Sequence, residues 1–175
     1  RFVPDARLDD LMVSYASDGG GVGPHVDSYD VFLLQAQGKR RWAIGHQHDL
    51  TLQADAPLKV LRNFEPTQTF DLGPGDMLYL PPRYAHDGLA IGECMTYSVG
   101  FKAPGLGELA GELLQRLVQD AAEMAGEKMY RDPQQVAVDA PAALPAGLEA
   151  FSRLALQRAL RDPMVLPRAL GEYLT

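Results

Sequence analysis

Two residues near the start of the chain have metal-binding side chains and a spacing that brings them together. His25 and Asp27 lie two apart in a run of strand-forming residues, and side chains two apart in a strand point to the same face. A third such residue, His86, follows the segment PGDMLYLPPRYA much later in the chain. Two imidazoles and one carboxylate leave open positions on a metal, which is the ligand set of non-haem iron(II) oxygenases. We therefore predict a metal site from these three residues, with no catalytic side chain beyond the ligands.

An arginine in the same stretch could hold an anion beside this metal site. Arg40 alternates with Trp42 and Ile44, which we expect to face the core, so its guanidinium would also point inward. A buried arginine needs an anionic partner. Its planar fork fits a carboxylate well, and a dicarboxylate co-substrate would supply one. We predict that Arg40 binds such a co-substrate.

The other chemically versatile residues give weaker indications. Asp18 precedes the glycine-rich loop GGGVG, where it could pair with a cationic substrate group or be solvated as an ordinary turn residue. His46 and His48 form an H-x-H in a loop, and we expect both to be exposed. Cys94 is the only cysteine, and it has no recognisable histidine partner for nucleophilic catalysis. The chain has no G-x-S-x-G, and GGGVG precedes a strand pattern rather than the helix of a phosphate-binding loop.

Composition places the chain among soluble globular proteins. Apolar residues make up 46% and charged residues 22% of its 175 residues, which argues against disorder. The longest apolar runs, such as 31–34, are far too short to span a membrane. A net charge of −7 disfavours direct nucleic-acid binding, which requires Lys and Arg to neutralise phosphates. The single cysteine suits a reducing compartment, so we expect the cytoplasm.

The segments that carry these residues have the pattern of a β-rich domain. We expect two strands at 25–35 and 40–44, joined as a hairpin by a tight turn at Gln37-Gly38. Further short strands are expected at 8–15, 58–64, 70–72, 77–80 and 95–101. Several short strands separated by turns predict a sandwich or barrel, which would occupy residues 1–103.

The sequence pattern changes at Pro104. Apolar residues from Leu106 to Met124 recur every three or four positions, the period of an amphipathic helix. A connector rich in proline and alanine at 130–145 separates it from a second helix at 148–160, and 168–174 could form a third. We predict a helical region over residues 104–175. Its apolar faces could pack on the barrel or mediate self-association, and the sequence alone leaves both open.

A family resemblance rests on three stretches, GGGVGPHVDSYDVFLLQAQGKRRW, PGDMLYLPPRYAHDG and TYSVGFKAP. Together they resemble the bacterial JmjC-type ribosomal oxygenases, the YcfD or RoxA family of ribosomal protein arginine hydroxylases. The resemblance implies a double-stranded β-helix core of the cupin superfamily, iron(II), and 2-oxoglutarate as co-substrate. It also implies a substrate, an arginine of large-subunit ribosomal protein number sixteen, and a homodimer formed through the helices after the barrel.

Matched position by position, the resemblance assigns site residues. The metal ligands fall on His25, Asp27 and His86, and the far carboxylate of 2-oxoglutarate falls on Arg40. Ser14 and Thr96 fall in the co-substrate pocket. Asp18, beside the loop at the mouth of the site, would be the candidate partner of the substrate guanidinium.

The ends of the chain suggest that it is a fragment. It opens at Arg1 without an initiator Met, and the winged-helix domain that follows the helices in that family is absent. We therefore expect a piece of a longer protein, which could be inactive by itself. Two alternatives to this oxygenase stay open. One is a metal-dependent cupin enzyme that does not use 2-oxoglutarate, and the other is a non-catalytic binding module with a cupin fold.

Overall fold

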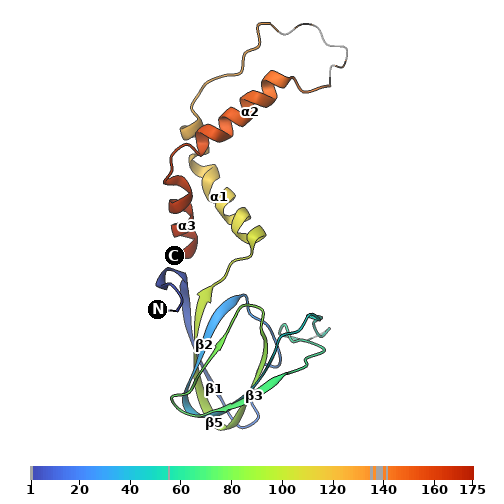
Figure 1. Ribbon diagram of the computed structural model, residues 1–175, viewed down its shortest axis with the longest axis vertical. Helices are drawn as coiled ribbons and strands as arrows, with labels where there is room; N and C mark the ends of the chain where they lie inside the picture. The colour runs from blue at the N-terminus through green and yellow to red at the C-terminus, as the bar shows by residue number, and fades with distance from the viewer. Residues whose placement is uncertain (1, 55, 135, 137–139, 141) are drawn as a thin grey trace. The chain divides into compact units, whose positions relative to one another are not determined.

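The computed structural model describes residues 2–54, 56–134, 136, 140 and 142–175. These residues form two compact units, a β-rich unit that ends at Gly105 and a helical unit that begins at Leu106. Figure 1 shows the strands gathered in the first unit and the helices in the second. The predicted β-rich core followed by a helical appendage is therefore confirmed. None of the described helices is long and apolar enough to cross a membrane.

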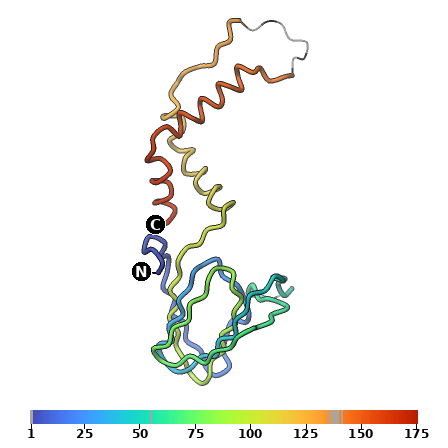
Figure 2. The backbone as a smooth tube through the Cα atoms, in the orientation of Figure 1, coloured from blue at the N-terminus to red at the C-terminus, as the bar shows by residue number. Residues whose placement is uncertain are grey.

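The β-rich unit is an antiparallel sheet built around two long strands. β2 (Tyr29–Gly45) and β5 (Ala85–Lys102) run side by side along their length, as the tube in Figure 2 shows. β1 (Leu8–Ala16) pairs with the last part of β5. β4 (Met77–Leu80) pairs with the first half of β2, and β3 (Gln68–Leu72) pairs with the second half. A short 3-10 helix, η1 (Asp5–Arg7), precedes β1.

The hairpin turn predicted at Gln37-Gly38 is wrong, because β2 continues through this point without reversing. The register between β2 and β5 shifts on both sides of Gln37, which marks a β-bulge. Gly38 has a φ of +64°, and a Cβ atom there would lie 2.0 Å from the carbonyl oxygen of Glu93. Only glycine fits this conformation and this close approach.

The bulge decides which side chains of β2 face the inside of the barrel. One extra residue inverts the alternation of a strand, so the buried positions change from odd to even numbers. Asp30, near the start of β2, is buried by its contacts with Arg7 and Tyr79. The other buried side chains along β2 are Val31, Leu33 and Gln35 before the bulge and Arg40, Trp42 and Ile44 after it. The apolar members of this set pack with Leu80 of β4 to form the core. Arg40 and Trp42 therefore face inward, as the sequence pattern predicted.

Three other predicted strand boundaries differ from the structure. The strand expected from residue 25 begins at Tyr29, and His25 instead forms an isolated bridge with His86. β5 begins at Ala85 rather than at 95, so His86 lies at the start of a long strand. The strand expected at 58–64 is reduced to a single bridge between Leu52 and Leu61.

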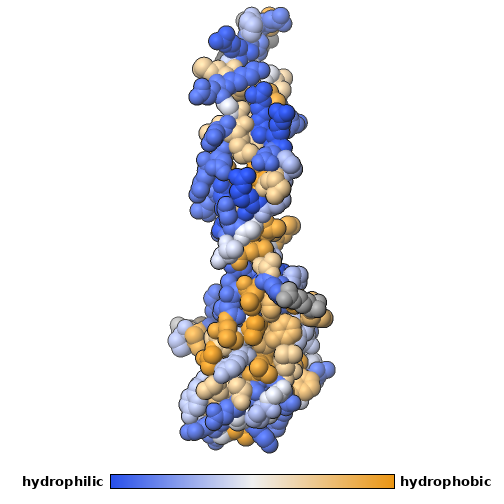
Figure 3. All heavy atoms as spheres, turned by 90° about the vertical axis from the view of Figure 1, so that its left-hand side faces the viewer, coloured by the Kyte–Doolittle hydropathy of each residue, from blue (hydrophilic) through white to orange (hydrophobic). Residues whose placement is uncertain are grey.

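The helical unit consists of α1 (Leu106–Ala125), α2 (Ala146–Ala159) and α3 (Val165–Leu174). Within the predicted connector at 130–145, residues 135, 137–139 and 141 lie outside the described residues. In this unit only Val165 and Ala169 are buried among the described residues. Large apolar side chains of α1 and α2 stay exposed, for example Leu114 at 64% and Leu156 at 68%. Apolar side chains also gather on one face of the β-rich unit (Figure 3).

Candidate metal centre

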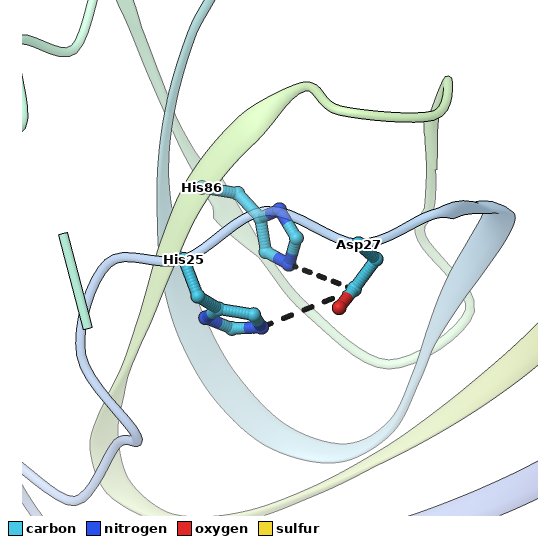
Figure 4. A group of neighbouring side chains, drawn as sticks. All are labelled: His25, Asp27 and His86. Atoms are coloured by element: carbon cyan, nitrogen blue, oxygen red, sulfur yellow. Dashed lines mark ion pairs between the residues drawn. The ribbon is translucent and has the colours of Figure 1, made fainter. Parts of the chain in front are cut away.

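Three side chains from two distant segments of the β-rich unit converge on one point. The carboxylate Oδ2 of Asp27 lies 3.9 Å from Nε2 of His25 and 3.5 Å from Nε2 of His86. One potential ligand atom from each of the three residues lies within 4.8 Å of the others. Figure 4 shows both imidazole rings directed at the Asp27 carboxylate. This is the only such group of three or more His, Cys, Asp or Glu side chains in the described part of the chain.

Backbone pairing brings the two histidines together. The His25 N–H donates to the His86 carbonyl and the His86 N–H donates to the His25 carbonyl, both at 2.9 Å. Because the two residues lie directly opposite each other in this pair of hydrogen bonds, their rings lie on the same face, with centroids 4.2 Å apart. The segment before β2 is thereby attached to the start of β5, although the two are far apart in sequence.

Hydrogen bonds to carbonyls fix the orientation of each ring. Nδ1 of His25 lies 2.8 Å from the carbonyl oxygen of Gly23, and Nδ1 of His86 lies 2.9 Å from that of Tyr84. With the proton on Nδ1 donated to the carbonyl, Nε2 keeps its lone pair and points toward Asp27. Such partners on the second ring nitrogen set the tautomer and orientation of metal-binding histidines.

The backbone of Asp27 is held by the loop that leads into β5. The Arg83 N–H donates to the Asp27 carbonyl at 2.7 Å. Arg83 has a φ of 63°, the left-handed conformation that non-glycine residues rarely adopt. The two prolines before it, Pro81 and Pro82, end β4 and begin this turn. The strained turn therefore holds the backbone of Asp27 in place.

Burial keeps one of the imidazoles neutral. His86 is only 3% exposed, and burial lowers its pKa below the usual 6.5, partly offset by its hydrogen bond to the Tyr84 carbonyl. A metal binds the neutral imidazole, so this shift favours metal binding at neutral pH. Two neutral imidazoles and one hard anionic oxygen fit a divalent transition metal that keeps open positions. The donor set therefore fits the metal that the sequence predicted.

A cavity of about 290 Å³ lies beside these residues. It is lined by His25 and Asp27, by Arg40 and Trp42, by the β1 residues Asp10, Met12 and Ser14, and by Val22, Tyr29, Val31, Leu33, Ser98 and Gly100. Arg40 is 7% exposed, and its Nε atom has no hydrogen-bond partner among the described residues. A buried guanidinium with an unused donor fits an anionic ligand in this cavity.

The other predicted site residues lie in different surroundings. Ser14 lines the cavity and its hydroxyl donates to the Thr96 carbonyl at 3.3 Å. The Thr96 hydroxyl donates to Oε1 of Gln35 at 2.8 Å, and Thr96 is fully buried outside the cavity lining. The exposed Asp18 accepts a hydrogen bond from the Gly92 N–H at 2.7 Å and is likewise not a lining residue. The structure thus brings Ser14 to the site but not the side chains of Thr96 and Asp18.

The histidines of the H-x-H loop are exposed, as expected. The ring centroids of His46 and His48 lie 5.5 Å apart, and both residues line a second, polar cavity of about 440 Å³. Neighbouring Asp49 accepts hydrogen bonds from the Asn63 side chain and the Thr51 N–H. These hydrogen bonds lower the pKa of Asp49 from 3.8 to about 2, and the one from Asn63 has the largest effect.

Sequence reasoning missed one acidic residue of the cavity, Asp10. It shares strand parity with Met12 and Ser14, and all three line the cavity from β1. Its neighbour Asp9 faces the other way, accepting from the Tyr29 hydroxyl at 2.6 Å and pairing with Lys102 at 3.2 Å. The available signal was the alternation D-x-M-x-S, which places a carboxylate on the face that also carries Ser14.

Comparison with known proteins identifies the family to which a chain with this site belongs. The sequence profile of the JmjC domain matches residues 1–109. The chain is 37% identical to the "Ribosomal protein uL16 3-hydroxylase" of Escherichia coli over 179 residues, which cover 100% of this chain and 46% of that protein. It is 43% identical over 117 residues to the "Probable ribosomal oxygenase" of Haemophilus influenzae, covering 62% of this chain and 28% of that protein.

A solved structure agrees with these matches. The E. coli ribosomal oxygenase YcfD in complex with cobalt and 2-oxoglutarate superposes with a TM-score of 0.75 at 37% identity. The match covers 98% of this chain and 44% of that one. This chain therefore spans less than half the length of the relatives that it matches.

Proposed function

The chain belongs to the JmjC domain family, and we propose that it is the core of an iron(II)- and 2-oxoglutarate-dependent oxygenase that hydroxylates an arginine side chain of ribosomal protein uL16. One observation carries the proposal. The three metal-capable side chains and Arg40, whose Nε has no hydrogen-bond partner among the described residues, border the same site, with His25, Asp27 and Arg40 on one cavity. A metal centre beside a buried cation is what an oxygenase with a dicarboxylate co-substrate requires.

His25, Asp27 and His86 would hold the metal through two Nε2 atoms and one carboxylate oxygen. When bound, iron(II) supplies the activation of dioxygen, which no amino-acid side chain provides. The protein's part is to orient both imidazoles correctly and to leave the remaining positions open. The carbonyls of Gly23 and Tyr84 perform the orientation.

Arg40 would bind the far carboxylate of 2-oxoglutarate. Its guanidinium can donate two parallel hydrogen bonds to a carboxylate, and burial makes each of them stronger than in water. Ser14 of β1 lines the same cavity, and its hydroxyl would donate to the same group in place of its 3.3 Å hydrogen bond to the Thr96 carbonyl. The low polarity of the neighbouring Val31 and Leu33 excludes competing water.

The remaining cavity wall suits an arginine side chain. Asp10 offers a carboxylate for the guanidinium, while Met12 offers an apolar surface for the methylene groups. Support for a ribosomal substrate comes from the E. coli relative, which is named as acting on uL16. The net charge of −7 also favours a basic protein partner and disfavours direct contact with RNA.

We further propose that the protein works as a cytoplasmic homodimer, assembled through the helical unit. Leu114, Val118 and Leu156 are 64%, 72% and 68% exposed, and exposed apolar side chains of this size favour a partner. The cytoplasm contains the proposed substrate and is compatible with the single free cysteine, Cys94.

The test is a hydroxylation assay by mass spectrometry. The chain, and a longer form if the chain is inactive, is incubated with iron(II), 2-oxoglutarate and arginine-containing fragments of uL16. We expect a mass gain of one oxygen on an arginine, together with one succinate per product, and neither with Asp27→Ala. Succinate without a modified arginine would redirect the substrate assignment. Hydroxylation without 2-oxoglutarate would instead support a metal-dependent cupin enzyme of another class.

A further inference from the structure

We propose that Trp42 positions both halves of the site, because its ring is a common surface against which His86 and Arg40 both lie. This inference rests on the proposed function, in which His86 binds the metal and Arg40 binds 2-oxoglutarate. It adds a positioning residue, and it also explains the glycine at position 88.

The indole lies between the two groups. Its ring centroid is 5.9 Å from that of His86, at an interplanar angle of 49°. The Cζ atom of Arg40 lies 5.7 Å from the same ring, within the range of a cation–π contact. The strand register explains this arrangement, because Ile44, Trp42 and Arg40 of β2 pair with His86, Gly88 and Ala90 of β5 in that order.

Gly88 makes room for the indole. A Cβ atom on Gly88 would lie 2.6, 2.7 and 2.9 Å from the Cζ3, Cη2 and Cε3 atoms of Trp42. Contacts this short do not occur, so any side chain at position 88 must displace the ring. The φ angle of Gly88 is outside the left-handed region, so its backbone does not require glycine. The space for Trp42 is therefore the reason for this glycine.

The ring itself is firmly held. Trp42 is 5% exposed and packs in the core with Leu33 and Leu80. Its Nε1 atom has no hydrogen-bond partner among the described residues, so the packing of the ring holds it in place. A displaced ring must either push the core residues packed against it or move into the cavity that it lines together with Arg40. A shift of Trp42 would therefore disturb His86 and Arg40 together.

The experiment compares four variants of the chain with cobalt(II) alone and then with 2-oxoglutarate as probes. Gly88→Ala displaces the ring, Trp42→Leu removes it, and Trp42→Phe retains a flat ring without the N–H. The control is Phe32→Leu, an aromatic residue of the same strand that contacts Phe101 instead, at 5.8 Å. Calorimetry gives both dissociation constants. Trp42 is the only tryptophan, so its emission reports directly whether Gly88→Ala moves the ring.

We expect Gly88→Ala to change the Trp42 emission and to weaken the binding of cobalt(II) and of 2-oxoglutarate by about tenfold or more, the effect of losing an outer support of a metal ligand. Trp42→Leu should weaken both, and Trp42→Phe should recover much of both losses. Phe32→Leu should lower the unfolding temperature and leave both constants unchanged.

Several results would overturn the inference. One is a Gly88→Ala protein with altered Trp42 emission but unchanged dissociation constants. Another is a variant that binds only one of the two ligands, cobalt(II) or 2-oxoglutarate, more weakly. A Trp42→Phe protein as impaired as Trp42→Leu would assign the effect to the N–H rather than to the ring. If Gly88→Ala does not fold, the two Trp42 variants decide. Failure of the unsubstituted chain to bind cobalt(II) would refute the proposed function, and the inference with it.

Discussion

Replacing Arg40 by methionine separates the role of its charge in ligand binding from its role in folding. Arg40 is 7% exposed and forms no ion pair among the described residues. Replacing even a buried ion pair by apolar residues of similar volume is often neutral or stabilising, by roughly 1–4 kcal/mol, and a buried charge without an ion-pair partner is costlier to keep. The Arg40→Met protein should therefore unfold at the same or a higher denaturant concentration than the unsubstituted protein when no ligand is present.

The same substitution should weaken the binding of 2-oxoglutarate. Truncating one partner of a buried charge pair costs about 2–5 kcal/mol, and the open cavity favours the lower part of this range. A loss of about 2–3 kcal/mol corresponds to a roughly 30- to 150-fold weaker affinity. Because ligand binding stabilises the folded state, saturating 2-oxoglutarate should raise the unfolding temperature of the unsubstituted protein much more than that of the variant.

The assay is calorimetry with cobalt(II) present, together with thermal unfolding with and without 2-oxoglutarate. Arg41→Met is the matched control, because Arg41 is the next residue but is exposed and forms a bidentate pair with Asp71 at 2.7 and 2.8 Å. We expect Arg41→Met to bind 2-oxoglutarate normally. Equal affinity in the Arg40→Met protein, or an equal loss in both variants, would refute the assignment of the co-substrate carboxylate to Arg40.

Three further predictions follow from the structure. Asp10→Asn should raise the KM for an arginine-containing uL16 peptide about tenfold or more, since a hydrogen bond to a charged group is worth about 1.5–3 kcal/mol. The KM for 2-oxoglutarate should stay unchanged. An unchanged peptide KM would exclude Asp10 from substrate binding. Gly38→Ala should lower the free energy of unfolding by at least about 2 kcal/mol in a denaturant titration, because φ is +64° and the new Cβ would lie 2.0 Å from the Glu93 oxygen. An unchanged free energy of unfolding would contradict the presence of the β-bulge at this position. Asp49 has a folded-state pKa of about 2 against 3.8, so its contribution to stability is present above pH 3.8 and is lost as the pH falls toward 2. Asp49→Asn should therefore flatten the pH dependence of the unfolding free energy in this window, and an unchanged slope would exclude Asp49 as its source.

The candidate metal ligands could be recognised from the sequence because their chemistry is local. His25 and Asp27 are two apart in an extended segment, so any strand-like conformation places both on one face. Arg40 could be placed inward because it alternates with Trp42. The proximity of His25 and Asp27 to His86 could not be derived in this way. It depends on a backbone bridge between distant segments, which no local pattern specifies.

The errors have a common physical origin in contacts with the partner strand. Glycine at position 38 fits a hairpin turn and a bulge equally well by its own conformation, and the carbonyl of Glu93 across the sheet decides between them. The direction of the Thr96 hydroxyl depends on the same pairing, because it donates to the side chain of Gln35, the residue opposite Thr96 on β2. Asp10 was overlooked because an Asp-Asp pair resembles a solvated surface until β1 is paired with β5.

The most direct test is an anomalous difference map, recorded at the cobalt absorption edge from crystals grown with cobalt(II) and 2-oxoglutarate. We predict one strong peak in the chain, about 2 Å from the Nε2 atoms of His25 and His86 and from a carboxylate oxygen of Asp27, with ligand density that reaches Arg40. A peak at His46 and His48, or no peak among the three predicted ligands, would contradict it.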